Sequence, residues 1–133
     1  ETDYETEDGR AFLVSVKKES PGFGSREAGK QLRTKLLNLL DANRAKALIL
    51  DWEGIPLISS SFADEAIGKL FVEMGPLEFS GRIKNIGLPA FVRQLIDKAI
   101  LQRSAQTVAR AHDVASSMNR EIKITETEAS PDE

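Results

Sequence analysis

The chain has 133 residues, 41% of them hydrophobic and 29% charged, which is the composition of one globular domain of ordinary size. It contains no cysteine, so disulfides, thiolate metal sites and a cysteine nucleophile are excluded. No apolar run approaches the roughly 18 residues that a membrane helix needs, and no signal peptide is visible, so we expect a cytoplasmic protein.

The net charge of −3 is unevenly distributed along the chain. Segments 1–9 and 126–133 are acidic and carry no base, so the part between them is net basic. We expect two solvated acidic tails, although the same pattern would also suit tails that screen a basic face from a polyanion. We do not expect nucleic acid as a partner, because the bases are scattered and aromatic residues make up only 6%.

The first third of the chain predicts a strand and a helix. Residues 11–16 are rich in β-forming residues and indicate a strand. Residues 20–24 have turn chemistry and leave room for a short second strand near Phe23. Ser25 is placed as a helix N-cap, and leucines at helical spacing then predict a helix over 26–42.

The middle of the chain predicts a buried strand, a polar turn and a second helix. Residues 47–51 form a short apolar run that ends in an acid, which is typical of a strand buried on both faces. An extended segment, 55–58, leads to the serine turn, Ser59-Ser60-Ser61. Apolar residues at helical spacing then predict a helix over 62–74, which ends at Gly75-Pro76.

The last part begins with a strand at 82–86, followed by a helix from Pro89. We place the domain at 10–103, and an additional helix and possible edge strand (at 121–125) within 104–125. Strands that alternate with helices predict an α/β fold: a single domain with a mainly parallel or mixed β-sheet packed with amphipathic helices.

The usual constellations of enzyme sites are missing. His112 is the only histidine, so common zinc sites and a Ser-His-Asp triad have little support. The sequence also lacks a glycine loop that would hold phosphate. The acid pairs Asp51/Glu53 and Asp64/Glu65 are explained by a strand end and a helix start. We therefore expect neither an enzyme nor a bound metal or cofactor.

Segment 49–70, ILDWEGIPLISSSFADEAIGKL, resembles the signature of STAS domains, the sulfate-transporter and anti-sigma-factor-antagonist family. In that signature a strand ending in Asp leads through a glycine and apolar positions to an Asp-Ser-Ser-Gly turn. Asp51 matches the acid, Gly54 the glycine, and Ser60 the serine that a partner kinase phosphorylates in the antagonists. The SSFADE run, with GSRE at 24–27, is most similar to a STAS-like branch of bacterial and archaeal proteins. The order of elements supports the resemblance over about residues 11–103.

The serine turn departs from the STAS signature on both sides. Ser59 replaces the acid before the serine pair, and Phe62 replaces the glycine after it. Asp64 and Glu65 replace small or apolar residues in the first helical turn. A phosphate on a serine at a helix N-terminus is favourable, but these two acids would repel it.

Two further residues near the turn have structural interpretations beside functional ones. Ser61 and Asp64 have the spacing of a capping box, worth about 1 kcal/mol. Arg26 opposes the dipole of its helix, and the helices of a parallel sheet start at the same edge. We expect Arg26 to pair with Asp64 or Glu65, or to clamp an anion beside Ser60; a solvated arginine is the alternative.

These features predict a non-enzymatic regulatory protein-interaction module, which docks a partner through residues 59–65 and the second helix. The resemblance implies a kinase-like ATPase of the anti-sigma type as partner, and a phosphorylation switch at Ser60. It equally allows a constitutive module that uses the acid pair as a fixed docking feature. Alternatives are a nucleotide- or small-anion-binding domain at the same sheet edge and, with least support, a hydrolase with an activated serine.

Overall fold

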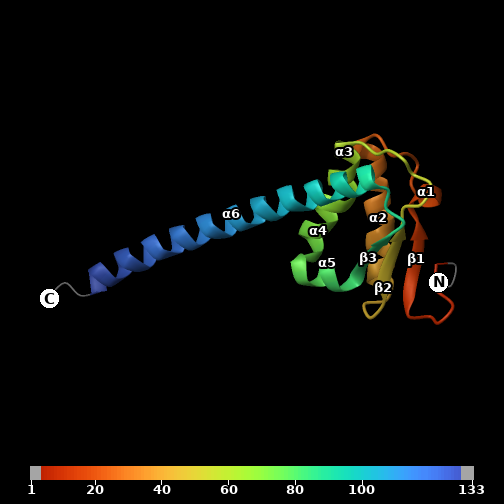
Figure 1. The fold of residues 1–133 in the computed structure, drawn as a ribbon. Helices are drawn as coiled ribbons and strands as arrows, with labels where there is room; N and C mark the ends of the chain where they lie inside the picture. Colours follow the sequence, from red (N-terminus) through yellow and green to blue (C-terminus); the bar gives the residue numbers. More distant parts are fainter. Residues whose placement is uncertain (1–3, 130–133) are drawn as a thin grey trace. The chain divides into compact units, whose positions relative to one another are not determined.

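The computed structural model describes residues 4–129, and their side chains as far as Asn119. Residues up to Arg103 form one α/β unit, and a second, helical unit follows from Ser104. All strands of the described chain belong to one sheet, with the order β1-β2-β3 and every pair parallel (Figure 1). The strands are β1 (Ala11–Ser15), β2 (Ala47–Asp51) and β3 (Ile83–Ile86). The predicted α/β class with a parallel sheet is therefore confirmed.

The helices are α1 (Val16–Glu19), α2 (Arg26–Ala42), α3 (Ser60–Ala63), the π-helix η1 (Asp64–Gly68), α4 (Lys69–Met74), α5 (Pro76–Arg82) and α6 (Ala90–Ala129). The bounds of α2 are those predicted, and the Ser25 hydroxyl caps it by accepting from the Ala28 N–H at 3.1 Å. α3, η1 and α4 follow one another without a break. Within η1, the Lys69 N–H bonds to the carbonyl of Asp64, five residues back, which defines a π turn.

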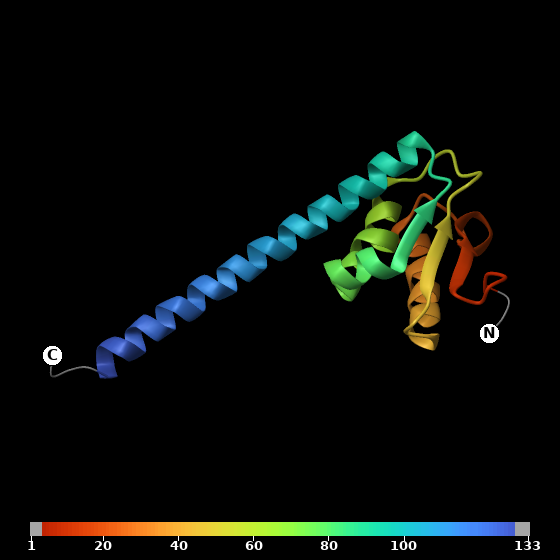
Figure 2. The same ribbon diagram turned by 60° about the horizontal axis from the view of Figure 1, so that its bottom comes forward.

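Helices α2, α4 and α5 cover one face of the sheet (Figure 2). Side chains alternate along a strand, so this face buries Phe12 and Val14 of β1, Leu48 and Leu50 of β2, and Ile83 of β3. On the opposite face Leu13 is aligned with Ile49, and neither is fully buried. The prediction that 47–51 is buried on both faces is therefore wrong, because no described helix packs on the second face.

Residues 4–9, predicted as part of a solvated tail, instead pack beside β1. The Leu13 N–H donates to the Tyr4 carbonyl at 2.6 Å, and the Thr6 N–H donates to the Ala11 carbonyl at 2.9 Å. Glu5 forms an ion pair with Lys46. The acidic composition did not predict this, because the stabilising contacts are backbone hydrogen bonds and a distant lysine. Residues 1–3 and 130–133 of the predicted tails lie outside the described residues.

Two predicted strands are absent from the described chain. Residues 121–125 continue α6, which runs to Ala129 with no glycine or proline to stop it. The segment around Phe23 is a series of bends, and the Phe23 carbonyl accepts from the Ser59 N–H at 3.0 Å instead of joining a ladder. No helix within residues 4–129 is long and apolar enough to cross a membrane.

Candidate functional site

The helix that carries the serine turn starts two residues earlier than predicted. Ser59 is its N-cap, and its hydroxyl accepts from the Phe62 N–H at 2.9 Å. Ser60 is the first helical residue and is exposed. The predicted capping box of Ser61 and Asp64 is wrong, because Ser61 already lies within the helix and the Asp64 carboxylate is bound by arginines.

The loop before α2 packs directly against the serine turn. Besides the backbone bond from Ser59 to Phe23, the rings of Phe23 and Phe62 meet edge to face, with centroids 6.0 Å apart. This packing brings the start of α2, and with it Arg26, beside the start of α3. The two sequence stretches that carried the family resemblance, at 24–27 and 59–65, therefore form one site.

Asp64 is held by two arginines. Arg103 donates to both carboxylate oxygens, from Nε to Oδ1 and from Nη2 to Oδ2, each at 2.7 Å. Arg26 adds a third bond to Oδ2 at 3.0 Å. The bidentate bond to Arg103, followed by that to Arg26, lowers the pKa of Asp64 from 3.8 to about 2, although burial opposes this change. The carboxylate is thus a charged, paired group with 15% of its side chain exposed.

Glu65 is buried more deeply, with 7% of its side chain exposed, and it is paired with three cations. Arg26 donates to Oε1 at 2.9 Å, Lys69 to Oε2 at 3.1 Å and Arg33 to Oε2 at 3.3 Å. Arg33 also donates to the backbone carbonyl of Glu65. Burial raises the pKa of Glu65, but the bonds from Arg26, Lys69 and Arg33 outweigh it and lower the pKa overall.

The expectation that Arg26 pairs with Asp64 or Glu65 is met, and it pairs with both. The other three cations were not predicted. Lys69 was open to prediction, since it follows Glu65 at the i,i+4 spacing of helical ion pairs. Arg33 lies two turns after Arg26 on the same face of α2. No local sequence pattern predicted the contact of Arg103 with Asp64, because this contact depends on how α6 packs.

Close packing of α2 on η1 positions this ion-pair cluster, which consists of Asp64, Glu65 and the four cations. Gly29 lies at the contact: a Cβ there would stand 2.9 Å from the Glu65 Cβ and 3.0 Å from the Phe62 carbonyl oxygen. Only glycine allows this approach without a shift of one helix. Gly29, the second glycine of the GSREAGK stretch, is therefore required for the packing that positions the cluster.

Asp51 is the last residue of β2, and Gly54 lies in the loop that leads from β2 to the serine turn. The Asp51 Oδ1 accepts from the Glu53 N–H at 3.1 Å, which closes the end of β2. Gly54 has a φ of +84°, a left-handed conformation that favours glycine. Of the apolar residues that follow, Ile55 and Ile58 are buried, whereas Leu57 is 63% exposed.

The outer surface of the serine turn is mixed apolar and polar. A hollow of about 400 Å³ is lined by Phe23, Gly24, Leu57, Ile58 and Ser59. A smaller one of about 130 Å³ is lined by Ser60, Leu95, Lys98, Ala99 and Gln102. Ser60 therefore shares a hollow with a lysine. No group of three His, Cys, Asp or Glu side chains within the described part of the chain could hold a metal ion.

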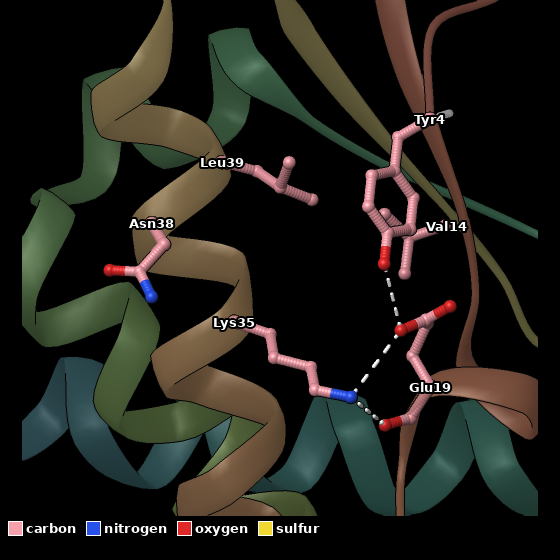
Figure 3. Close-up of a pocket in the computed structure, with 6 residues that line it drawn as sticks. All are labelled: Tyr4, Val14, Glu19, Lys35, Asn38 and Leu39. Carbon is pink, nitrogen blue, oxygen red and sulfur yellow. Dashed lines mark hydrogen bonds and ion pairs between the residues drawn. The ribbon is translucent and has the colours of Figure 1, made fainter. Parts of the chain in front are cut away.

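A separate pocket of about 230 Å³ lies between β1 and α2, lined by Tyr4, Val14, Glu19, Lys35, Asn38 and Leu39 (Figure 3). Three of its polar residues are engaged with one another: the Tyr4 hydroxyl donates to Glu19 Oε1 at 3.0 Å, and Lys35 Nζ donates to the Glu19 carbonyl at 3.0 Å. This pocket was not predicted, because the segment that holds Tyr4 was expected to be a tail.

Comparison with known proteins supports the resemblance. No curated protein and no solved structure gave a match. Residues 28–89 match a family model described as a STAS-like domain of unknown function (DUF4325). The matched stretch contains the serine turn, Gly29 and the acid pair, whereas Arg26 and Arg103 lie outside it. The match over residues 28–89 is to the STAS-like family that the sequence resemblance indicated.

Proposed function

We propose that this chain is a non-enzymatic regulatory module that binds a partner protein through the outer surface of the serine turn, and that phosphorylation of Ser60 switches the binding. The observation that carries the proposal is the contrast between the two sides of the turn. Its inner side is fixed by the Ser59 cap and the ion-pair cluster, whereas its outer side presents Leu57 and Ser60 to solvent. A rigid element with an exposed apolar residue beside an apolar hollow suits protein docking.

The ion-pair cluster weakens the electrostatic objection to phosphorylation. A phosphate on Ser60 would add between one and two negative charges near Asp64 and Glu65. Both acids are already paired with cations, which offsets most of their repulsion. Lys98 lines the same hollow as Ser60 and would attract the phosphate. Ser60 also lies at the start of a helix, where an added negative charge is favourable.

The acid pair itself is a poor docking feature. Its two side chains are largely buried, and each is saturated with charged partners. If the module acts without phosphorylation, the docking surface would consist of Leu57, Ser60 and the hollow beside Phe23. By resemblance, the partner would be a kinase-like ATPase of the anti-sigma type, in the cytoplasm of a bacterium.

Binding of a small anion at the hollow of Ser60 and Lys98 is a second candidate. The hollow, at about 130 Å³, is smaller than the roughly 300–1,000 Å³ of typical ligand pockets, so a phosphate-sized ion suits it better than a nucleotide. A hydrolase has less support, since the residues that share this hollow with Ser60 include no histidine or acid to act as a base.

The docking surface is tested by exchanging exposed leucines. The immobilised chain is incubated with extract of the cells that express it, and retained proteins are identified by mass spectrometry. Leu57→Asp should lose a partner that the original chain and Leu77→Asp both retain. Leu77 is the control because it is 90% exposed but lies on α5, away from the turn. Equal retention by both variants would reject the serine turn as the docking surface.

The switch is tested by intact mass after incubation with the same extract and ATP. We expect a mass increase of one phosphate, which Ser61→Ala keeps and Ser60→Ala loses. An unmodified chain, or a phosphate that persists in Ser60→Ala, would contradict the switch. A rise in melting temperature with inorganic phosphate alone would favour the ligand-binding candidate instead.

A further inference from the structure

The pocket between β1 and α2 has walls that are held in place by the protein itself. Val14 is a buried residue of β1, and Leu39 is a partly buried residue of α2. The remaining wall is the ring of Tyr4, whose backbone carbonyl accepts from the Leu13 N–H at 2.6 Å and whose hydroxyl donates to Glu19 Oε1 at 3.0 Å. Tyr4 is therefore fixed both at its backbone and at the end of its side chain. A pocket formed in advance does not have to order its walls when a ligand enters, which favours binding.

The volume of this pocket suits a molecule with one ring. At about 230 Å³ it exceeds the roughly 150 Å³ of an engineered apolar cavity that binds benzene, but it is smaller than the roughly 300–1,000 Å³ of typical ligand pockets. Figure 3 shows the Tyr4 ring and the Leu39 side chain on opposite sides of the pocket. A flat ring between them would cover apolar carbon on both sides, and an aromatic ring would also pack favourably against the ring of Tyr4. Size and lining therefore favour a single aromatic ring.

One end of the pocket offers both a hydrogen-bond acceptor and a donor. The Glu19 carboxylate has about four acceptor positions, and the described bonds, from the Tyr4 hydroxyl and from Lys35 Nζ, use two of them. Lys35 Nζ has three donors, of which the described bonds to the Glu19 carbonyl and to Oε1 use two. Figure 3 shows this pair below Tyr4 and Leu39. A hydroxyl group, which both donates and accepts, matches the remaining donor and acceptor positions.

The same end of the pocket is balanced in charge. Lys35 Nζ and Glu19 Oε1 form an ion pair at 3.4 Å, and the other lining residues are uncharged. An anion placed there would be repelled by Glu19 and a cation by Lys35, and either would lose part of its hydration. An uncharged ligand avoids both penalties.

We propose that the pocket between β1 and α2 binds an uncharged molecule with a single aromatic ring that carries a hydroxyl group. The ring lies between Tyr4 and Leu39, and the hydroxyl bonds to the pair of Glu19 and Lys35. The pocket shares no lining residue with the hollows of the serine turn, so this site is distinct from the docking surface.

The test uses the fact that Tyr4 is the only tyrosine of the chain, so that incorporation of 3-fluorotyrosine places one fluorine on the wall of the pocket. The full chain is titrated with p-cresol, and its fluorine NMR signal is followed. Toluene, which has the same ring and methyl group but no hydroxyl, is the chemical control. Leu39→Trp fills the pocket, whereas Leu37→Trp makes the same change at a partly buried leucine of the same helix that does not line it. Melting temperatures check that both variants stay folded.

We expect p-cresol to shift the signal saturably in the original chain and in Leu37→Trp, with a Kd of about 1 mM or tighter. Toluene should bind about tenfold more weakly, because it cannot bond to the charged pair, and Leu39→Trp should no longer bind p-cresol. The absence of a saturable shift, an equal affinity for toluene, or equal binding by the two tryptophan variants would each overturn the proposal.

If Leu39→Trp does not fold, Glu19→Gln takes its place. This change removes the charge of the acceptor and keeps its size, so it should weaken the binding of p-cresol and leave that of toluene unchanged. An equal loss for both probes, or no loss for p-cresol, would overturn the proposal. Docking at the serine turn is tested separately through Leu57, so the two proposals can fail independently.

Discussion

Replacing Asp64 by asparagine removes one charge from the ion-pair cluster while keeping the size of the side chain. The pKa of Asp64 falls from 3.8 to about 2 in the folded protein, so its ionised form stabilises folding by roughly 2 kcal/mol at neutral pH. Because the folded pKa is the lower one, this contribution is complete above about pH 5 and is lost as the pH falls toward 2. Asp64→Asn should therefore destabilise the protein strongly at pH 7 and less at acidic pH.

Urea unfolding followed by Trp52 fluorescence measures this difference, since Trp52 is fully buried and its indole N–H donates to Asn85 at 2.8 Å. We expect a loss of about 2 kcal/mol in Asp64→Asn at pH 7, and roughly half of that loss at pH 3. Asp41→Asn, which changes an exposed carboxylate at the end of α2, is the control and should have little effect. An equal loss at both pH values, or one no larger than in Asp41→Asn, would refute the assigned role of the Asp64 charge.

Two further predictions concern the geometry of the serine turn and its packing. Ser59→Ala removes the N-cap and should lower the stability measured by thermal unfolding by about 1 kcal/mol, whereas Ser61→Ala should change it little. A larger loss of stability in Ser61→Ala than in Ser59→Ala would instead identify Ser61 as the cap. Gly29→Ala forces a Cβ against the Glu65 Cβ at 2.9 Å and should cost about 1–3 kcal/mol in urea unfolding. Gly24→Ala is its control, because a Cβ at Gly24 would have no heavy atom within 4 Å. Equal stability of the two variants would show that α2 can shift away from η1.

Elements with strong local signals were predictable, and the short helices α1 and α5 were not. α2 has a serine cap and leucines at regular helical spacing, and its observed bounds are those predicted. α1 and α5 have four and seven residues, too few for a periodic pattern to emerge. The continuation of α6 over 121–125 was missed because two isoleucines that alternate with polar residues also fit a helix.

The site was predictable where it depends on topology and unpredictable where it depends on exact helix starts. In a parallel sheet the helices that follow strands begin at the same edge, and this sufficed to bring Arg26 to the acid pair. Any of three consecutive serines can cap a helix, so local sequence could not choose among them. The choice of Ser59 is made by its backbone bond to Phe23 and by the arginines that bind Asp64.

The π turn makes the site depend on chain length as well as on residue identity. A π turn holds one residue more than an α turn, so a deletion of one residue within 64–68 would restore a regular α-helix and leave α3 and α4 in phase. Leu70 and Phe71, which are buried after the turn, would then keep their directions, whereas the acids within the turn would change theirs. A related protein that lacks one residue here would therefore keep the core contacts and give up the ion pairs. The extra residue of the π turn is thus a requirement of the acid pair and not of the core.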